Sequence, residues 1–213
     1  MIVEHLQLGM LACNCTIIAD EEIREAVVVD GGDGVDAVLE RLRELNVRAK
    51  YLVHTHAHID HIRDVGRLRD ATRSSALLHH EDLPLYHALA EQARMFGLGE
   101  VPKVVDLDAY FVDGEALQIG SITVNVLHTP GHTPGSCCFA LADAGKNLIL
   151  SGDTLFRGAI GRWDIGGTSM EDIVSSIHRK LMDFGDDTVV VPGHGPFTTI
   201  GTERTSNPYL VSR

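Results

Sequence analysis

The sequence predicts an α/β fold. In the N-terminal half, apolar strand-like runs alternate with amphipathic helical periods, and the C-terminal half is mostly strand-like before a last helix and strand. The length of 213 residues, with 44% hydrophobic and 23% charged residues, is typical of a globular protein with a sizeable core. We expect a single domain over residues 1–213.

The N-terminal half is expected to follow a β-α-β-α rhythm. Strands are predicted where apolar runs are bounded by turn residues, at 2–8, 13–20, 25–32, 49–56 and 75–80. Helices are predicted where apolar residues recur every three or four positions, at 35–46, 61–72 and 81–97. Several strands are followed by a histidine or aspartate, which places polar groups at the carboxyl ends where sites on open sheets commonly lie.

The C-terminal half is expected to be richer in strands. Turn signals at Gly120-Ser121 and Ala144-Gly145 separate apolar runs. Ser169, with Asp172 three residues on, is typical of a helix N-terminus. The predicted strands are 115–129, 136–143, 147–153 and 188–195, and the predicted helix is 169–185.

Charge and cysteine usage narrow the class of protein. A net charge of −12 disfavours nucleic acid as a partner, and no apolar run approaches the roughly 20 residues that a membrane helix needs. The N-terminus does not resemble a secretion signal, and the cysteines lie inside apolar runs as two local pairs. We therefore expect buried free thiols and a cytoplasmic protein.

The most unusual stretch is HTHAHIDH, from His54 to His61, with four histidines in eight residues. A packed core gains little from imidazoles, because each buried ring nitrogen needs a partner. A metal site needs such ligands. Three later ligand-type residues follow apolar runs beside glycines: His132 in PGHTPGS, Asp153 in SGDTLF and His194 in PGHGPF.

Together these residues predict a site for a pair of divalent ions. Histidines with carboxylates suit Zn²⁺, Fe or Mn, and the sequence does not choose among them. A carboxylate, most plausibly Asp153, would bridge two ions at roughly 3.5–4 Å. His54 and His128 are expected to support the ligands. His79 and His80 are expected to be capping or surface groups before a helix, with a place in a pocket as the alternative.

THAHIDH with PGHTPGS, SGDTLF and PGHG resembles the metallo-β-lactamase superfamily. The resemblance implies an αββα sandwich of two mixed β-sheets flanked by helices. It also implies seven metal ligands: His56, His58 and His132 for one ion, Asp60, His61 and His194 for the other, and Asp153 as the bridge.

Within that superfamily, NCTII, GDTLFRGAIGRWDIGG and ERTSNPYL resemble the glyoxalase II branch, and PGHGPFTT resembles its short bacterial members. The chain is expected to be without the C-terminal helical domain of the long enzymes. The resemblance implies hydrolysis of a glutathione thioester such as S-D-lactoylglutathione by a metal-bridging hydroxide, and we expect the two divalent ions to be Zn²⁺, with Fe or Mn as alternatives.

The mechanism expected from this chemistry needs few further groups. Asp60 would accept a hydrogen bond from the nucleophilic water, and the thiolate would leave without protonation. Arg162, Arg204 and Tyr209 are candidates for substrate binding, because guanidinium pairs with carboxylates. The alternatives are structural salt bridges for the arginines and core packing for Tyr209.

Rival functions stay open on the sequence alone. One is a glutathione persulfide dioxygenase that uses one iron on His56, His132 and Asp153. Another is a lactonase, β-lactamase or phosphodiesterase of the same fold. A non-catalytic binding or redox-partner module is the third. The acyl group, the thiol carrier and the oligomeric state are not predicted.

Overall fold

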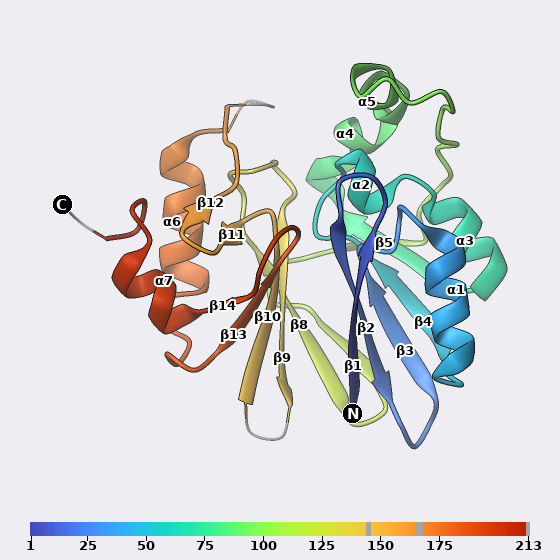
Figure 1. Cartoon of the computed structure of the whole chain (residues 1–213), viewed down its shortest axis with the longest axis horizontal. Helices are drawn as coiled ribbons and strands as arrows, with labels where there is room; N and C mark the ends of the chain where they lie inside the picture. Colours follow the sequence, from blue (N-terminus) through green and yellow to red (C-terminus); the bar gives the residue numbers. More distant parts are fainter. Residues whose placement is uncertain (144–145, 165–167, 212–213) are drawn as a thin grey trace. The chain divides into compact units, whose positions relative to one another are not determined.

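The computed structural model describes residues 1–143, 146–164 and 168–211, so the predicted turn at Ala144-Gly145 and residues 165–167 lie outside the described residues. The chain divides into two compact units (Figure 1). Unit 1 comprises residues 1–111 and 118–122, and unit 2 comprises residues 112–117 and 123–213. Among the helices in the described residues, none has the length and apolarity to cross a membrane.

Unit 1 is built on a six-stranded mixed sheet in the order β1-β2-β3-β4-β5-β6. Its strands are β1 (Ile2–Leu8), β2 (Cys13–Asp20), β3 (Glu25–Val29), β4 (Arg48–Val53), β5 (Ser75–His79) and β6 (Ala109–Phe111). The first three are antiparallel, and β3 to β6 are parallel. The carboxyl ends of β3, β4 and β5 therefore lie at one edge of the sheet.

The helices of unit 1 cover this sheet with apolar faces. They are α1 (Val35–Glu44), α2 (Ile59–Ile62), α3 (Val65–Thr72), α4 (Leu83–His87) and α5 (Leu89–Met95). Val38 and Leu42 of α1 and Leu68 of α3 are buried in one cluster with Val28 and Leu52 of the strands. Burial of this apolar surface is the main stabilising contribution to the unit.

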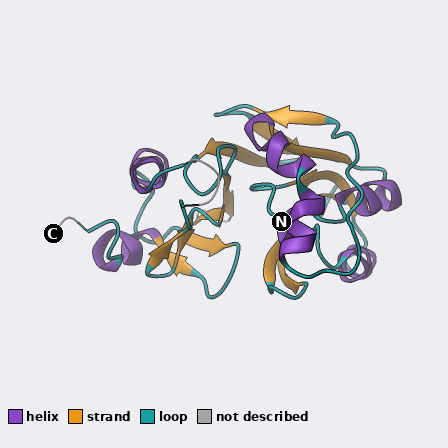
Figure 2. Cartoon of the chain, turned by 90° about the horizontal axis from the view of Figure 1, so that it is seen from above, coloured by secondary structure: helices purple, strands orange, loops and turns teal. Residues whose placement is uncertain are grey.

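Unit 2 carries most of a second mixed sheet, ordered β14-β13-β10-β9-β8-β7. Its strands are β7 (Ala116–Ile119), β8 (Ile122–His128), β9 (Cys137–Asp143), β10 (Lys146–Gly152), β13 (Val189–Pro192) and β14 (Thr198–Thr199). A two-stranded sheet joins β11 (Leu155–Phe156) to β12 (Ala159–Ile160). In Figure 2 the strands are orange and the helices purple.

Helix α6 (Met170–Lys180) packs its apolar face on the sheet of unit 2, and α7 (Ile200–Ser206) follows β14. Ile173 and Ile177 of α6 are buried with Cys138 and Ile149 of β9 and β10. Ser169 and Asp172 form the expected capping box at the start of α6. Two mixed sheets with helices confirm the predicted fold class.

Three predicted helices differ from the observed ones by more than the two residues by which α1 falls short of 35–46. The stretch 61–72 is broken between α2 and α3, because the Asp64 amide donates to the carbonyl of Gly32 instead of continuing a helix. The stretch 81–97 forms a 3₁₀ turn and the helices α4 and α5, which meet at Ala88. The helix predicted to reach residue 185 ends at Lys180.

Candidate metal centre

The histidine-rich segment of unit 1 links the carboxyl end of β4 to α2. Its conformation is fixed by the buried carboxylate of Asp30, which follows β3. Asp30 accepts hydrogen bonds from the backbone amide and the hydroxyl of Thr55, both at 2.8 Å. Asp30 has φ 55, in the left-handed region where aspartate is one of the tolerated residues.

Two further buried side chains hold the middle of this segment. Asp82 accepts a hydrogen bond from the amide of Ala57 at 2.8 Å. Gln92 of α5 accepts from the amide of Ile59 at 2.9 Å and donates to the carbonyl of Ala57 at 3.1 Å. The backbone between His56 and Ile59 therefore has fixed partners, which pre-orients the ligand side chains.

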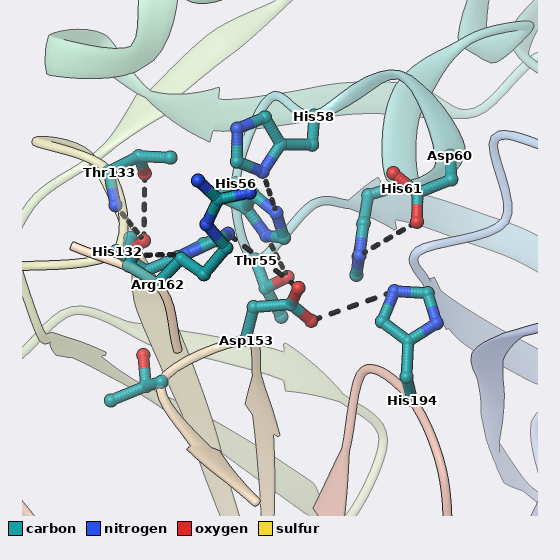
Figure 3. A network of polar contacts seen from close by, with 12 residues as sticks. Thr55, His56, His58, Asp60, His61, His132, Thr133, Asp153, Arg162 and His194 are labelled. Atoms are coloured by element: carbon teal, nitrogen blue, oxygen red, sulfur yellow. Dashed lines mark hydrogen bonds and ion pairs between the residues drawn. The ribbon is translucent and has the colours of Figure 1, made fainter. Parts of the chain in front are cut away.

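The four predicted ligands of unit 1 lie close together (Figure 3). His56 Nε2 is 2.9 Å from His58 Nδ1, and the ring centroids of His56 and His61 are 4.0 Å apart. Oδ2 of Asp60 is 3.6 Å from Nε2 of His61. Unit 1 thus brings three imidazoles and a carboxylate into one cluster.

His61 is fully buried between an acid and a thiol. Its Nδ1 lies 3.0 Å from Oδ2 of Asp30 and 3.6 Å from Sγ of Cys13. Burial lowers the pKa of His61, but Cys13 and Asp30 outweigh it, so the pKa lies well above its usual value. Burial raises the pKa of Cys13 to about 11.

The three predicted ligands of unit 2 also form a cluster. His132 follows β8, Asp153 follows β10, and His194 follows β13. Oδ2 of Asp153 lies 3.6 Å from Nε2 of His132, and Oδ1 lies 3.8 Å from Nε2 of His194 (Figure 3). Each carboxylate oxygen of Asp153 therefore faces a different imidazole.

The orientation of His132 is fixed by the loop that follows β12. Its Nδ1 donates to the carbonyl of Arg162 at 2.8 Å, which leaves Nε2 as the ring nitrogen on the side of Asp153. Gly161 allows this approach: a Cβ there would lie 1.8 Å from the carbonyl oxygen of Asp153 and 3.1 Å from Nδ1 of His132.

Three histidines outside the predicted ligand set contact backbone groups. His54 Nδ1 donates to the carbonyl of His61 at 2.9 Å, and burial lowers the pKa of His54 to about 4. His79 accepts a hydrogen bond from the amide of Glu81 at the start of the 3₁₀ turn. His128 donates to the carbonyl of Pro134 at 2.9 Å.

The predicted substrate-binding residues have different surroundings in unit 2. Arg162 is exposed and makes a bidentate pair with Asp164, with both N···O distances 3.0 Å. Arg204 pairs with Asp186 and donates to the carbonyls of Met182 and Phe184, as in the structural alternative. Tyr209 is 43% exposed and contacts Trp163 edge to face.

Sequence reasoning missed the residues that orient unit 1's ligands. Asp30 had a signal, because an aspartate before Gly31 and Gly32 follows a buried strand as Asp153 does. Asp82 and Gln92 had none, because each bonds a backbone group 25 or more residues away. Such contacts depend on the packing of α5 and do not follow from local periodicity.

The donor sets of both units fit divalent ions. The 2.9 Å between His56 Nε2 and His58 Nδ1 is a hydrogen-bond distance, and it is also short enough for both nitrogens to lie about 2.0–2.1 Å from one ion. The 3.6 and 3.8 Å on either side of Asp153 are too long for hydrogen bonds and close to the spacing of two ligands of one ion. Neutral imidazoles with carboxylates are ligands for Zn, Fe or Mn.

Comparison with known proteins places this ligand pattern in a family. The family described as the metallo-beta-lactamase superfamily matches residues 8–194. Over 214 residues, spanning all of both chains, the sequence is 35% identical to the hydroxyacylglutathione hydrolase GloC of Haemophilus influenzae.

Two solved structures share the fold over nearly the whole chain. The BLEG-1 B3 metallo-beta-lactamase is 31% identical with a TM-score of 0.88, covering 99% of this chain and 100% of that one. TTHA1623 in a di-iron-bound form is 34% identical with a TM-score of 0.84, covering 97% of this chain and 100% of that one. The protein therefore belongs to the metallo-β-lactamase superfamily and is a metallo-hydrolase of that fold.

Proposed function

We propose that the protein is a metal-dependent thioester hydrolase whose substrates include 2-hydroxyacyl thioesters such as S-D-lactoylglutathione. The proposed metals are two divalent ions, Zn²⁺ in our proposal. The proposed ligands are those that membership of the superfamily implies: His56, His58 and His132 for one ion, Asp60, His61 and His194 for the other, and Asp153 shared. The resemblance of the full chain to GloC, at 35% identity, supports the thioester.

The observation that carries the proposal is the position of Asp153. One of its oxygens faces His132 and the other faces His194, at 3.6 and 3.8 Å. A carboxylate that only positioned a histidine would make one short hydrogen bond to it. The observed arrangement suits a carboxylate that would help His132 and His194 to hold divalent ions.

Bound divalent ions would supply Lewis acidity, which lowers the pKa of water and polarises a carbonyl. The chain's own groups orient the reactants. Asp60 would accept a hydrogen bond from the attacking water. Because a thiolate is a good leaving group at neutral pH, hydrolysis of a thioester needs no separate general acid.

Arg162 is the best placed of the predicted substrate-binding side chains for a carboxylate. It is exposed, and its backbone carbonyl anchors His132. Its pairing with Asp164 is solvent-exposed and therefore weak, so an incoming carboxylate can replace it. We propose that Arg162, together with Tyr209, whose ring contacts that of the neighbouring Trp163, binds the thiol carrier. Arg204 would contribute mainly to the stability of unit 2.

The rival function is oxidation of a persulfide with a single iron. It requires oxygen and yields sulfite, whereas hydrolysis releases a free thiol without oxygen. One neighbour of the same fold holds two irons, so the identity of the metal does not separate these reactions. The four free cysteines, all buried, agree with our proposal of a cytoplasmic location.

The test uses purified protein loaded with Zn²⁺ or Fe²⁺, comparing thiol release from S-D-lactoylglutathione with oxygen uptake on glutathione persulfide. We expect thiol release, no oxygen uptake and about two ions per chain. Asp153→Asn should lower both turnover and metal content, and Asp183→Asn, an exposed residue of unit 2, should change neither. Oxygen uptake without thiol release would overturn the proposal.

A further inference from the structure

Apolar side chains gather at a turn where polar residues are usual. The turn between β1 and β2 carries Met10 and Leu11, which are 72% and 43% exposed. Tight turns favour glycine, asparagine, aspartate, proline and serine. Large apolar side chains exposed together at such a tip indicate a surface that binds an apolar group.

The structure fixes this turn in place. Gly9 and Ala12 have φ of 66 and 53, and the amide of Ala12 donates to the carbonyl of Gly9 at 3.3 Å. The carboxylate of Asp33 packs against Gly9 so closely that a Cβ at position 9 would lie 1.9 Å from Oδ2 of Asp33. Met10 and Leu11 are therefore presented by a defined conformation.

A second apolar wall comes from the chain after α5. Phe96 is 51% exposed, and Leu98 follows Gly97, which has φ 66. The amide of Leu98 bonds the carbonyl of Ala93 at 2.9 Å, which returns the chain toward the helix end. This segment and the first turn are more than 80 positions apart in the sequence, yet both line one hollow of unit 1.

The hollow between these walls has a volume of about 80 Å³. Ile59 and Asp60 of α2 contribute to its lining, together with Met10, Leu11, Phe96 and Leu98. Its volume is far below the roughly 300 Å³ or more of pockets for drug-sized ligands, so it suits a short chain. The proposed catalytic residue Asp60 thus lies at the edge of an apolar recess.

The charged groups at the recess favour a neutral occupant. Arg63 also lines it, but its guanidinium is balanced by Asp33 at 3.7 Å and Asp64 at 3.6 Å. Asp33 itself lines the recess, so a carboxylate bound there would meet like charge. An uncharged aliphatic chain contacts the apolar walls without electrostatic repulsion from Asp33.

We propose that this recess binds the aliphatic part of the acyl group of the substrate. The enzyme then prefers a thioester with a short unbranched chain, such as butanoyl, to its propanoyl and acetyl homologues. The inference rests on the proposed function, because it places the acyl carbonyl near Asp60. Met10, Leu11, Phe96 and Leu98 are then residues that determine specificity for the acyl chain.

The first test compares acetyl, propanoyl, butanoyl and octanoyl thioesters of N-acetylcysteamine with the metal-loaded enzyme. Burial of each added methylene should raise kcat/KM about fourfold up to butanoyl. Octanoyl should gain nothing further, because the recess is small. A kcat/KM that does not depend on acyl length would overturn the inference.

Substitutions of recess residues test whether the recess causes the dependence of kcat/KM on acyl length. Leu11→Ser and Phe96→Ala should each reduce the gain per methylene to less than twofold, and Leu11→Trp should fill the recess and make acetyl the best substrate. Ile23→Ala is the matched control, since Ile23 is 48% exposed on the next hairpin turn of unit 1. An unchanged acyl profile in all three recess variants would contradict the assignment.

A binding measurement separates this inference from the proposed function. Thioether ketones of N-acetylcysteamine, in which a methylene between sulfur and carbonyl prevents hydrolysis, are titrated by calorimetry. The Kd should decrease about fourfold for each added methylene in the unaltered protein and in Ile23→Ala. In Phe96→Ala the Kd should not depend on the length of the acyl chain. If Kd depends on acyl length in this way but no thioester is hydrolysed, the proposed function is wrong and the recess assignment stands. If thioesters are hydrolysed but Kd does not depend on acyl length, the recess assignment is wrong and the proposed function stands.

Discussion

Nδ1 of His61 lies 3.0 Å from Oδ2 of Asp30, and both side chains are almost fully buried. Asp30 also accepts two hydrogen bonds from Thr55, so its oxygens are fixed as acceptors. The contact selects the tautomer of His61 with a proton on Nδ1 and a lone pair on Nε2. That is the form in which Nε2 can bind a metal.

Asp30→Asn is therefore expected to weaken metal binding by about 10–100-fold. The amide would present N–H groups to His61 and favour the wrong tautomer. A competition titration with a chromophoric chelator measures the affinity. Asp36→Asn, at an exposed carboxylate paired with Arg67, is the control that should leave it unchanged. Equal affinities in the two variants would mean that Asp30 does not orient His61.

Gln92→Leu should lower the free energy of unfolding by about 2–4 kcal/mol, because buried backbone groups lose their partners. Gln92 bonds Ala57 and Ile59 of the ligand segment and also the carbonyl of Leu85. Urea denaturation of the metal-free protein measures the change. Gln7→Ala, at an exposed position of β1, should cost less than about 0.5 kcal/mol. A similar small cost for Gln92→Leu would refute the role given to this side chain.

Gly161→Ala is expected to disrupt the cluster of unit 2. Its Cβ would require the carbonyl of Asp153 and the ring of His132 to move. We predict a loss of activity of at least about tenfold, since misplacement by about 1 Å can cost a hundredfold. Steady-state kinetics would measure the loss of activity, and metal analysis would measure any loss of bound metal. Gly99→Ala, where a Cβ meets nothing within 4 Å, should behave as the unaltered protein.

The hairpin formed by β2 and β3 in unit 1 should lose stability in acid. Asp20 accepts hydrogen bonds from the amide and hydroxyl of Ser121 and from the amides of Glu22 and Ile23, which hold its pKa well below the usual value. Its stabilisation is therefore complete above the unfolded pKa of about 3.9 and is lost as the pH falls further.

This prediction can be checked by denaturation of Asp20→Asn and of the unaltered protein between pH 7 and pH 2. The variant should be less stable at pH 7, and the difference should shrink below pH 4. Asp187→Asn, at an exposed position, should show no such trend. A difference that stays constant down to pH 2 would show that the charge of Asp20 contributes nothing.

The sequence predicted the longer strands because they follow local rules of apolar patterning, whereas the short strands β6, β11, β12 and β14 and the helix α7 were not predicted. HTHAHIDH comes directly after an apolar run, and the structure places it at the end of β4. Apolar periodicity did not reveal where helices break: the bond from Asp64 to Gly32 divides α2 from α3 across 32 positions. Nor could it show that Met10 and Leu11 face the same hollow as Phe96, because that depends on how β1, β2 and α5 pack.

The measurement that tests the central claim most directly is the loss of thioester absorbance when the purified protein is given S-D-lactoylglutathione, with and without a chelator. We predict rapid hydrolysis that the chelator abolishes and that added Zn²⁺ or Fe²⁺ restores. No hydrolysis by protein that carries two ions per chain, or hydrolysis that survives complete removal of metal, would contradict the account.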